Sequence, residues 1–215
     1  MQFANEIDAS QLVQFRGAVI ASLKEKDILF HNHDNDKLRY SYPLIQYKRI
    51  HGKAAVMGIG KGVKSISKLL NLKDFNFQIG KERVDIQLEA INAYDNKIVL
   101  AEELDFRYRL RSWLPLNSKN YGQYQNAESL IEQIAILERV LKGNILSFLK
   151  GFDFYLEELI KLHITDVADH YYLTYKRIKM MAFDVEFKTN ISLPQYIGLG
   201  KNASVGCGML TRITN

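Results

Sequence analysis

The stretch LPQYIGLGKNASVGCGML occupies residues 193–210 of this 215-residue chain and contains four glycines within eleven residues. Because glycine adopts positive φ and lets another backbone approach closely, two Gly-x-Gly pairs can turn successive N–H groups toward one anion. Lys201 and Ser204 add a charge and a hydroxyl group, so the pattern favours an anion-binding loop over a tightly packed turn. A dinucleotide-binding motif follows a first strand and opens a helix, whereas this loop leads into a final strand at 208–213. Its glycines are Gly198, Gly200, Gly206 and Gly208.

The residues before this loop predict a domain of strands around one long helix. Residues 126–149 carry Leu, Ile and Phe at helical spacing, which predicts the strongest helix of the chain. A strand at 105–114 is expected before this helix, and residues 171–187 predict strands with an unassigned turn. Pro115 and the polar run 117–126 are expected to form a connection.

The first hundred residues predict the order strand, helix, strand, strand, helix, strand, which is the split βαβ order of a ferredoxin-like fold. We therefore predict an α+β fold with two tandem ferredoxin-like domains, residues 1–100 and 101–215, the second containing the C-terminal glycine-rich loop. The expected elements are strands at 3–7, 40–50 and 54–59, helices at 10–25 and 63–70, a hairpin of 84–90 with 97–100, and a loop at 28–37.

The composition excludes several classes of protein. No apolar run reaches the roughly 18 residues of a membrane span, and the N-terminus lacks an export signal. Cys207 is the only cysteine, so an intrachain disulfide and a thiolate metal cluster are both excluded. We expect a cytoplasmic protein without membrane contact and without a cofactor.

The positive charge is concentrated in two segments, although the net charge is only +5. Residues 37–73 contain nine basic and no acidic side chains, and residues 188–215 contain three basic and no acidic ones. If the fold brings the two segments together, they form a face that attracts phosphates. An ordinary solvated basic surface is the alternative. Residues 58–65 resemble a P-loop but have Val63 where its glycine must stand, so a strand-to-helix turn is favoured.

Two histidines in the polar loop are candidates for acid–base chemistry. His31 and His33 bracket Asn32, so in an extended segment both rings face one side. A histidine titrates near neutral pH and can take a proton from a ribose 2′-OH or give one to a leaving oxygen. Asp34 and Asp36 suggest a metal site instead, but no third ligand is indicated, and we predict no metal.

Aromatic and basic residues alternate after this loop, as in surfaces that stack on bases and contact phosphates. The alternative is that one face of this strand packs in the core and does not contact RNA. The alternating residues Arg107, Arg109 and Arg111 predict either a cationic stripe or a salt-bridged sheet face. The residues of the first pattern are Arg39, Tyr40, Tyr42, Tyr47, Lys48 and Arg49.

Four segments together resemble the RAMP superfamily (repeat-associated mysterious proteins), and more narrowly the Cas-six type, b subfamily, of CRISPR repeat-processing endoribonucleases. They are FRGAVI (15–20), FHNHD (30–34), RSWLPLN (111–117) with KGNILSFLKG (142–151), and the terminal glycine-rich loop. The chain departs from the family at Cys207, where an aromatic residue is frequent.

The resemblance implies tandem ferredoxin-like domains and metal-independent cleavage within CRISPR repeats, leaving a 2′,3′-cyclic phosphate and a 5′-OH. It implies His33 as the first choice of general acid or base, His31 as its partner or substitute, and Tyr40 as a hydrogen-bond donor to the phosphate. The expected RNA-binding residues are Arg39, Lys48, Arg49, Lys53, Gly198, Gly200, Lys201, Ser204, Gly206 and Gly208.

The expected partner is CRISPR repeat RNA, and other CRISPR effector subunits and a second copy of the chain are further candidates. The alternative function is a non-catalytic RAMP-family subunit that binds guide RNA in an effector complex. A third hypothesis is an unrelated ferredoxin-like enzyme for a small phosphorylated ligand, which a closed pocket in place of an open basic groove would indicate.

Overall fold

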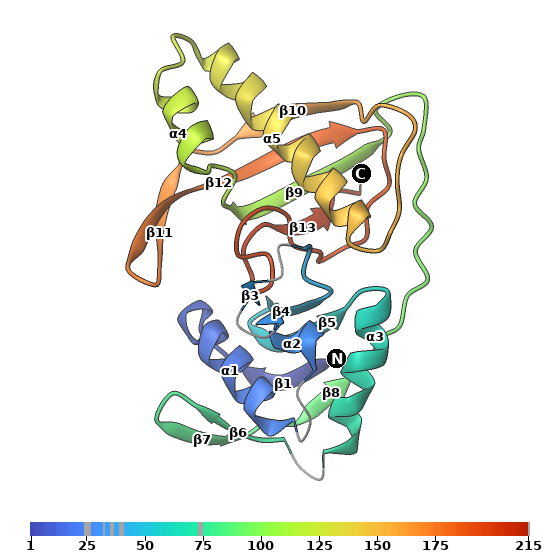
Figure 1. The fold of residues 1–215 in the computed structure, drawn as a ribbon, viewed down its shortest axis with the longest axis vertical. Coiled ribbons are helices and arrows are strands. Elements are labelled where there is room, and N and C mark those ends of the chain that lie inside the picture. Colours follow the sequence, from blue (N-terminus) through green and yellow to red (C-terminus); the bar gives the residue numbers. More distant parts are fainter. Residues whose placement is uncertain (24–26, 32, 35–36, 39–40, 73–74, 215) are drawn as a thin grey trace. The chain divides into compact units, whose positions relative to one another are not determined.

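The computed structural model describes residues 1–23, 27–31, 33–34, 37–38, 41–72 and 75–214 (Figure 1). Contacts divide the chain into two compact units, and the second unit is interrupted by a short piece that belongs to the first. The first unit is Met1–Tyr94 with Ser204–Gly206, and the second is Asp95–Ala203 with Cys207–Asn215. Within the described residues, every helix is too short or too polar to cross a membrane.

The first unit contains a four-stranded antiparallel sheet in the order β4-β5-β1-β8. The central strand β1 is antiparallel to both of its neighbours, and the chain alternates strand, helix, strand, strand, helix, strand as predicted. The elements are β1 (Gln2–Glu6), α1 (Leu12–Ser22), β4 (Ile45–Ile50), β5 (Lys53–Gly58), α3 (Lys61–Ile66) and β8 (Leu88–Ala90).

Aromatic side chains form the centre of this unit. Phe15 of α1 lies edge-on to Phe3 of β1, with ring centroids 5.9 Å apart, and edge-on to Tyr47 of β4 at 6.1 Å. All three residues are fully buried. Because Leu12, Phe15 and Val19 recur at helical spacing, α1 presents one apolar side to this core.

The predicted hairpin of 84–90 with 97–100 is wrong. Strand β7 (Glu82–Asp85) pairs instead with β6 (Asn76–Ile79), and β8 pairs with β1 at the edge of the four-stranded sheet. The other short elements are η1 (Ala9–Gln11), α2 (Ile28–His31), β2 (His33–Asp34), β3 (Lys37–Leu38) and η2 (Ser67–Asn71).

The second unit repeats the strand order of the first, as β10-β12-β9-β13, and β11 extends the sheet by pairing with β12. The long helix α5 contributes a buried side of Leu137, Leu141 and Ile145 to the core. Residues 190–208, all of which are described, contain no helix and connect the third and fourth core strands. The elements are β9 (Phe106–Trp113), α4 (Ser118–Gln125), α5 (Leu130–Lys150), β10 (Leu162–Val167), β11 (Tyr171–Tyr175), β12 (Ile178–Thr189) and β13 (Met209–Arg212).

Candidate nucleic-acid interface

The predicted histidine loop contains a one-turn helix followed by two-residue strands. His31 is the last residue of α2, and His33 begins β2, where it pairs with Leu38 of β3. The side chains of both histidines lie outside the described part of the structure, as do Arg39 and Tyr40 entirely. Phe30, next to His31, is 1% exposed and belongs to the core cluster of the first unit.

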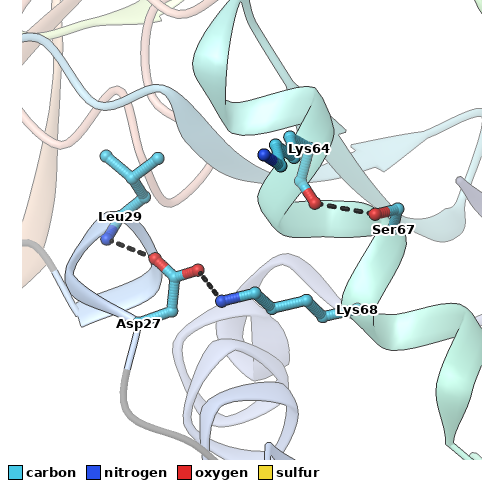
Figure 2. Close-up of polar contacts among 5 residues, drawn as sticks. All are labelled: Asp27, Leu29, Lys64, Ser67 and Lys68. Carbon is cyan, nitrogen blue, oxygen red and sulfur yellow. Dashed lines mark hydrogen bonds and ion pairs between the residues drawn. The ribbon is translucent and has the colours of Figure 1, made fainter.

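Asp27 caps α2 and connects it to the residues after α3 (Figure 2). Its Oδ1 accepts a hydrogen bond from the Leu29 N–H at 3.0 Å, and its Oδ2 accepts one from Lys68 Nζ at 2.8 Å. Burial raises the pKa of Asp27, but hydrogen bonds from Lys68, Leu29 and Ser65 outweigh burial and hold the pKa below its usual range. The carboxylate therefore stays charged in a nearly buried position.

The three predicted cations of β4 and β5 have different surroundings. Lys48 is fully buried, so its ammonium group does not lie at the surface. Arg49 is exposed, and its Nε donates to the Ile7 carbonyl at 2.6 Å. Lys53 Nζ lies 2.5 Å from Glu89 Oε1, and the Lys53 side chain is 31% exposed.

The carboxylate-free segment 37–73 receives counter-charges from other parts of the chain. Glu89 pairs with Lys53, and Asp27 pairs with Lys68. Tyr42, which precedes β4, and Tyr47 of β4 are buried, at 7% and 0% exposure, so the core alternative is correct for both of these rings. Their rings are not available to stack on bases.

The first half of the glycine-rich loop packs against RSWLPLN and KGNILSFLKG, two of the stretches that carry the family resemblance. Gly200 has φ 86°, and an added Cβ would lie 2.8 Å from Trp113 Nε1. That indole nitrogen donates to Asn144 Oδ1 of α5 at 2.9 Å. The RSWLPLN segment, the GNILSF segment and the loop therefore meet at one place, because a side chain at Gly200 would collide with the Trp113–Asn144 pair.

Lys201 is held at the base of the loop by two main-chain contacts. Its N–H donates to the Leu114 carbonyl at 3.2 Å, and its Nζ donates to the Leu116 carbonyl at 2.7 Å. Burial lowers the pKa of Lys201. An ammonium group has three protons, so the bond to Leu116 leaves capacity for a further acceptor.

The second half of the loop is constrained by close packing. Gly206 has φ 86°, and a Cβ there would overlap the Leu12 side chain; Gly208 has φ 60°, and a Cβ would overlap the Leu199 carbonyl oxygen. The Gly208 N–H donates to the Ser112 carbonyl at 3.0 Å. Packing therefore accounts for these two glycines, which is the interpretation that the sequence disfavoured.

Ser204 lies in a turn of the loop, and Gly198 lies at an isolated β-bridge. The Tyr47 N–H of β4 donates to the Ser204 carbonyl at 2.8 Å, and this pairing belongs to the first unit. Gly198 forms an isolated antiparallel bridge with Met209. Several of the loop's main-chain polar groups therefore serve to hold the loop itself.

The arginine stripe of β9 is partly a salt-bridged face. Arg109 Nη2 lies 2.5 Å and Nε lies 3.0 Å from Glu186 Oε1, on the neighbouring strand β12. The alternative of a salt-bridged sheet face is therefore correct for Arg109.

Sequence reasoning missed both the Asp27 cap and the Trp113–Asn144 hydrogen bond. An aspartate directly before an apolar segment was a usable signal for the start of a helix.

Two family models match this chain, and each covers most of one of its two units. The Cas6b N-terminal domain family matches residues 1–97, and the Cas6b C-terminal domain family matches residues 100–213. The topology defines a tandem ferredoxin-like protein with a glycine-rich segment before its last strand. The two family matches cover nearly the whole chain, and the chain belongs to the Cas6b family.

Several known proteins are similar to the chain. A solved structure of Cas6b is 28% identical with a TM-score of 0.85, covering 98% of this chain and 94% of its own. A solved CRISPR RNA processing endoribonuclease Cas6b is 25% identical with a TM-score of 0.70, covering 99% and 98%. The uncharacterized protein MJ0978 of Methanocaldococcus jannaschii is 31% identical over 145 residues, covering 67% of this chain and 92% of that protein.

Proposed function

We propose that this chain is a metal-independent endoribonuclease that cuts CRISPR precursor RNA within its repeats. The products would carry a 2′,3′-cyclic phosphate and a 5′-OH. The observation that carries the proposal is that both Cas6b domain families match, at residues 1–97 and 100–213. The solved relative named a CRISPR RNA processing endoribonuclease, which covers 99% of the chain, adds support.

The proposed reaction needs one proton acceptor and one proton donor. The ribose 2′-oxygen attacks the adjacent phosphorus, the bond from phosphorus to the 5′-oxygen breaks, and the 2′-OH proton passes to a base. The leaving 5′-oxygen receives a proton from an acid, and histidine serves either purpose near neutral pH. We assign His33 as general acid or base, His31 as its partner or substitute, and Tyr40 as a donor to the reacting phosphate.

RNA contact is proposed for cations and for the glycine-rich loop. Arg49 and Lys53 are accessible to solvent, and Lys201 retains ammonium protons beyond its bond to Leu116. Phosphate contacts of this kind weaken when salt competes. Lys48 is buried, so its effect on RNA binding would be indirect. The other proposed contacts are Arg39, Gly198, Gly200, Ser204, Gly206 and Gly208.

A small phosphorylated ligand is disfavoured. The second unit has a half-open pocket of about 360 Å³ between α4, α5 and the end of β10. Asp166, Asp169 and His170 are among its lining residues, and none of the lining residues is Lys or Arg. Carboxylates at this pocket would repel a phosphate group.

The test is cleavage of a labelled repeat RNA from the chain's own CRISPR locus, with EDTA present. We expect one cut with a cyclic phosphate end, and a single-turnover rate at least about 100-fold lower for His31→Ala/His33→Ala. His163→Ala, a histidine bonded to Glu138 in the other unit, is the matched control. Tight binding with no cut would favour the guide-RNA-binding subunit, and absence of both would refute the proposal.

A further inference from the structure

The histidine loop begins with a helix that is too short to be stable by itself. Helix α2 has four residues, Ile28–His31. One turn of helix fixes many backbone dihedrals for few hydrogen bonds, so isolated single turns do not persist. The conformation of this turn must therefore be set by contacts with the rest of the first unit.

Two anchors hold the turn, one apolar and one polar. Phe30 is 1% exposed and packs in the core cluster of the first unit. At the start of the turn, Asp27 accepts the Leu29 N–H with Oδ1 at 3.0 Å and the Phe30 N–H with its main-chain carbonyl at 3.0 Å. The side chain and main chain of Asp27 thus satisfy two amide donors that a helix start leaves without internal partners.

The polar anchor reaches beyond the turn itself. Oδ2 of Asp27 accepts a hydrogen bond from Lys68 Nζ at 2.8 Å, and Lys68 lies in η2, which follows α3. Figure 2 shows this carboxylate between the Leu29 amide and the Lys68 ammonium group. The Ser67 hydroxyl donates to the Lys64 carbonyl at 2.7 Å on the same segment. Asp27 therefore links the helix start to a second, separately held element.

The position of this anchor in the sequence connects it with the proposed chemistry. His31 is four residues after Asp27, at the end of the turn, and His33 follows two residues later at the start of β2. A change in the direction of α2 would shift the backbone of His31 and His33, because the connection between them is one residue long. Reacting groups tolerate little displacement before the rate falls.

We propose that Asp27, through its contacts with Leu29 and Lys68, is a positioning residue that orients the backbone of His31 and His33 for RNA cleavage. This inference rests on the proposed function, since it assigns a role in that same reaction. In this role Asp27 acts through the backbone of the turn and needs no contact with the reacting atoms. A buried carboxylate is costly unless it is paired and hydrogen-bonded, and here both its oxygens have partners.

The test compares variants that remove the anchor in parts. Asp27→Asn keeps an oxygen that can accept the Leu29 N–H but loses the charge, Lys68→Met removes the ion pair and leaves the Asp27 carboxylate in place, and Asp27→Ala removes both contacts of the carboxylate. Ile86→Val, a core change in the same unit, is the control for mild destabilisation. All are measured as full-length protein, below the melting temperature of each variant, on repeat RNA.

The positioning role predicts a fall in rate without a fall in RNA affinity. We expect the single-turnover rate at saturating protein to drop by about tenfold or more for Asp27→Ala. The drop should be smaller for Asp27→Asn and Lys68→Met, and within twofold of wild type for Ile86→Val. The Kd for an uncleavable repeat RNA with a 2′-deoxy nucleotide at the cut site should stay within about threefold of wild type, because that RNA reports binding alone.

Other results would overturn either this inference or the proposed function on which it rests. If wild type cuts and all three anchor variants cut within twofold of it, Asp27 is not a positioning residue. Rates that fall only in proportion to lost RNA affinity, or that fall equally for Ile86→Val, also overturn the inference. If Asp27→Ala does not fold, the same criteria apply to Asp27→Asn and Lys68→Met. If wild type itself does not cut, the proposed function is what fails.

Discussion

Replacing Gly208 by alanine tests how far packing shapes the glycine-rich loop. Gly208 has φ 60°, and an added Cβ would overlap the Leu199 carbonyl oxygen. A residue with a Cβ atom costs roughly 1–2 kcal/mol in this left-handed backbone conformation. Relieving the overlap would also break two hydrogen bonds. The Leu199 N–H donates to the Gly208 carbonyl at 2.8 Å, and the Gly208 N–H donates to the Ser112 carbonyl at 3.0 Å. Each bond contributes about 1 kcal/mol, so the free energy of unfolding should fall by about 3–4 kcal/mol.

A second glycine in the same unit provides a control of opposite sign. Gly143 lies in α5, and an added Cβ there meets no atom within 4 Å. Because alanine favours a helix over glycine, Gly143→Ala should raise the free energy of unfolding by about 0.8–1 kcal/mol. Urea unfolding followed by the fluorescence of Trp113, the only tryptophan, measures both variants. If the free energy of unfolding of Gly208→Ala lies within about 0.5 kcal/mol of the wild-type value, the packing explanation of the loop is wrong.

Three further changes test single contacts. The pKa of Asp27 is lowered in the folded protein, so the stability that its charge contributes is present above its unfolded pKa and is lost as pH falls through the folded pKa. In an acid titration below about pH 4, Asp27→Asn should therefore lose less stability than wild type. The Tyr47 hydroxyl is buried with no hydrogen-bond partner among the described residues, so Tyr47→Phe should raise the free energy of unfolding by about 1 kcal/mol, and a loss of stability would reveal a missed partner. Trp113→Phe leaves Asn144 Oδ1 without its donor and should cost roughly 1–3 kcal/mol by thermal unfolding followed by circular dichroism; an unchanged midpoint would show that this bond is not stabilising.

The predictable elements are those with a strong local signal. Helix α5 repeats apolar residues at helical spacing, and Leu137, Leu141 and Ile145 are buried as that spacing requires. The strand-helix-strand-strand-helix-strand order of the first unit followed from alternating segments and turns, and the sheet order β4-β5-β1-β8 agrees with it.

The missed elements depend on contacts with distant residues. Helix α4 has a polar sequence with a glycine inside it, and it buries only Tyr124; its one local signal was the Asn117 cap, which accepts the Asn120 N–H at 2.8 Å. Strand β8 pairs with Phe3, more than eighty residues earlier, instead of forming the expected local hairpin. The residues of such short strands specify their register and partner only weakly, so the sequence did not indicate which strand β8 would pair with.

The surroundings of the candidate site residues could not be predicted from the sequence. The sequence suggested that Lys48 is a cation at the surface. Its neighbours on β4 gave no sign that the Lys48 side chain is fully buried. Likewise Tyr42 and Tyr47 were as compatible with base stacking as with a core, and their burial decides for the core. The partners of Lys53 and Lys68, Glu89 and Asp27, come from outside the basic segment.

The sequence alone determined the helices and strands with clear periodicity and the two-domain α+β class, and it suggested residue types suited to acid–base chemistry and phosphate binding. These properties are local, because periodicity, turn residues and charge are read over a few neighbouring positions. Only the tertiary structure decided which glycines are required by packing, which cations are buried, and that Asp27 and Lys68 anchor the histidine loop. Those properties depend on atoms brought together from distant parts of the chain, since burial and pairing are set by neighbours in space.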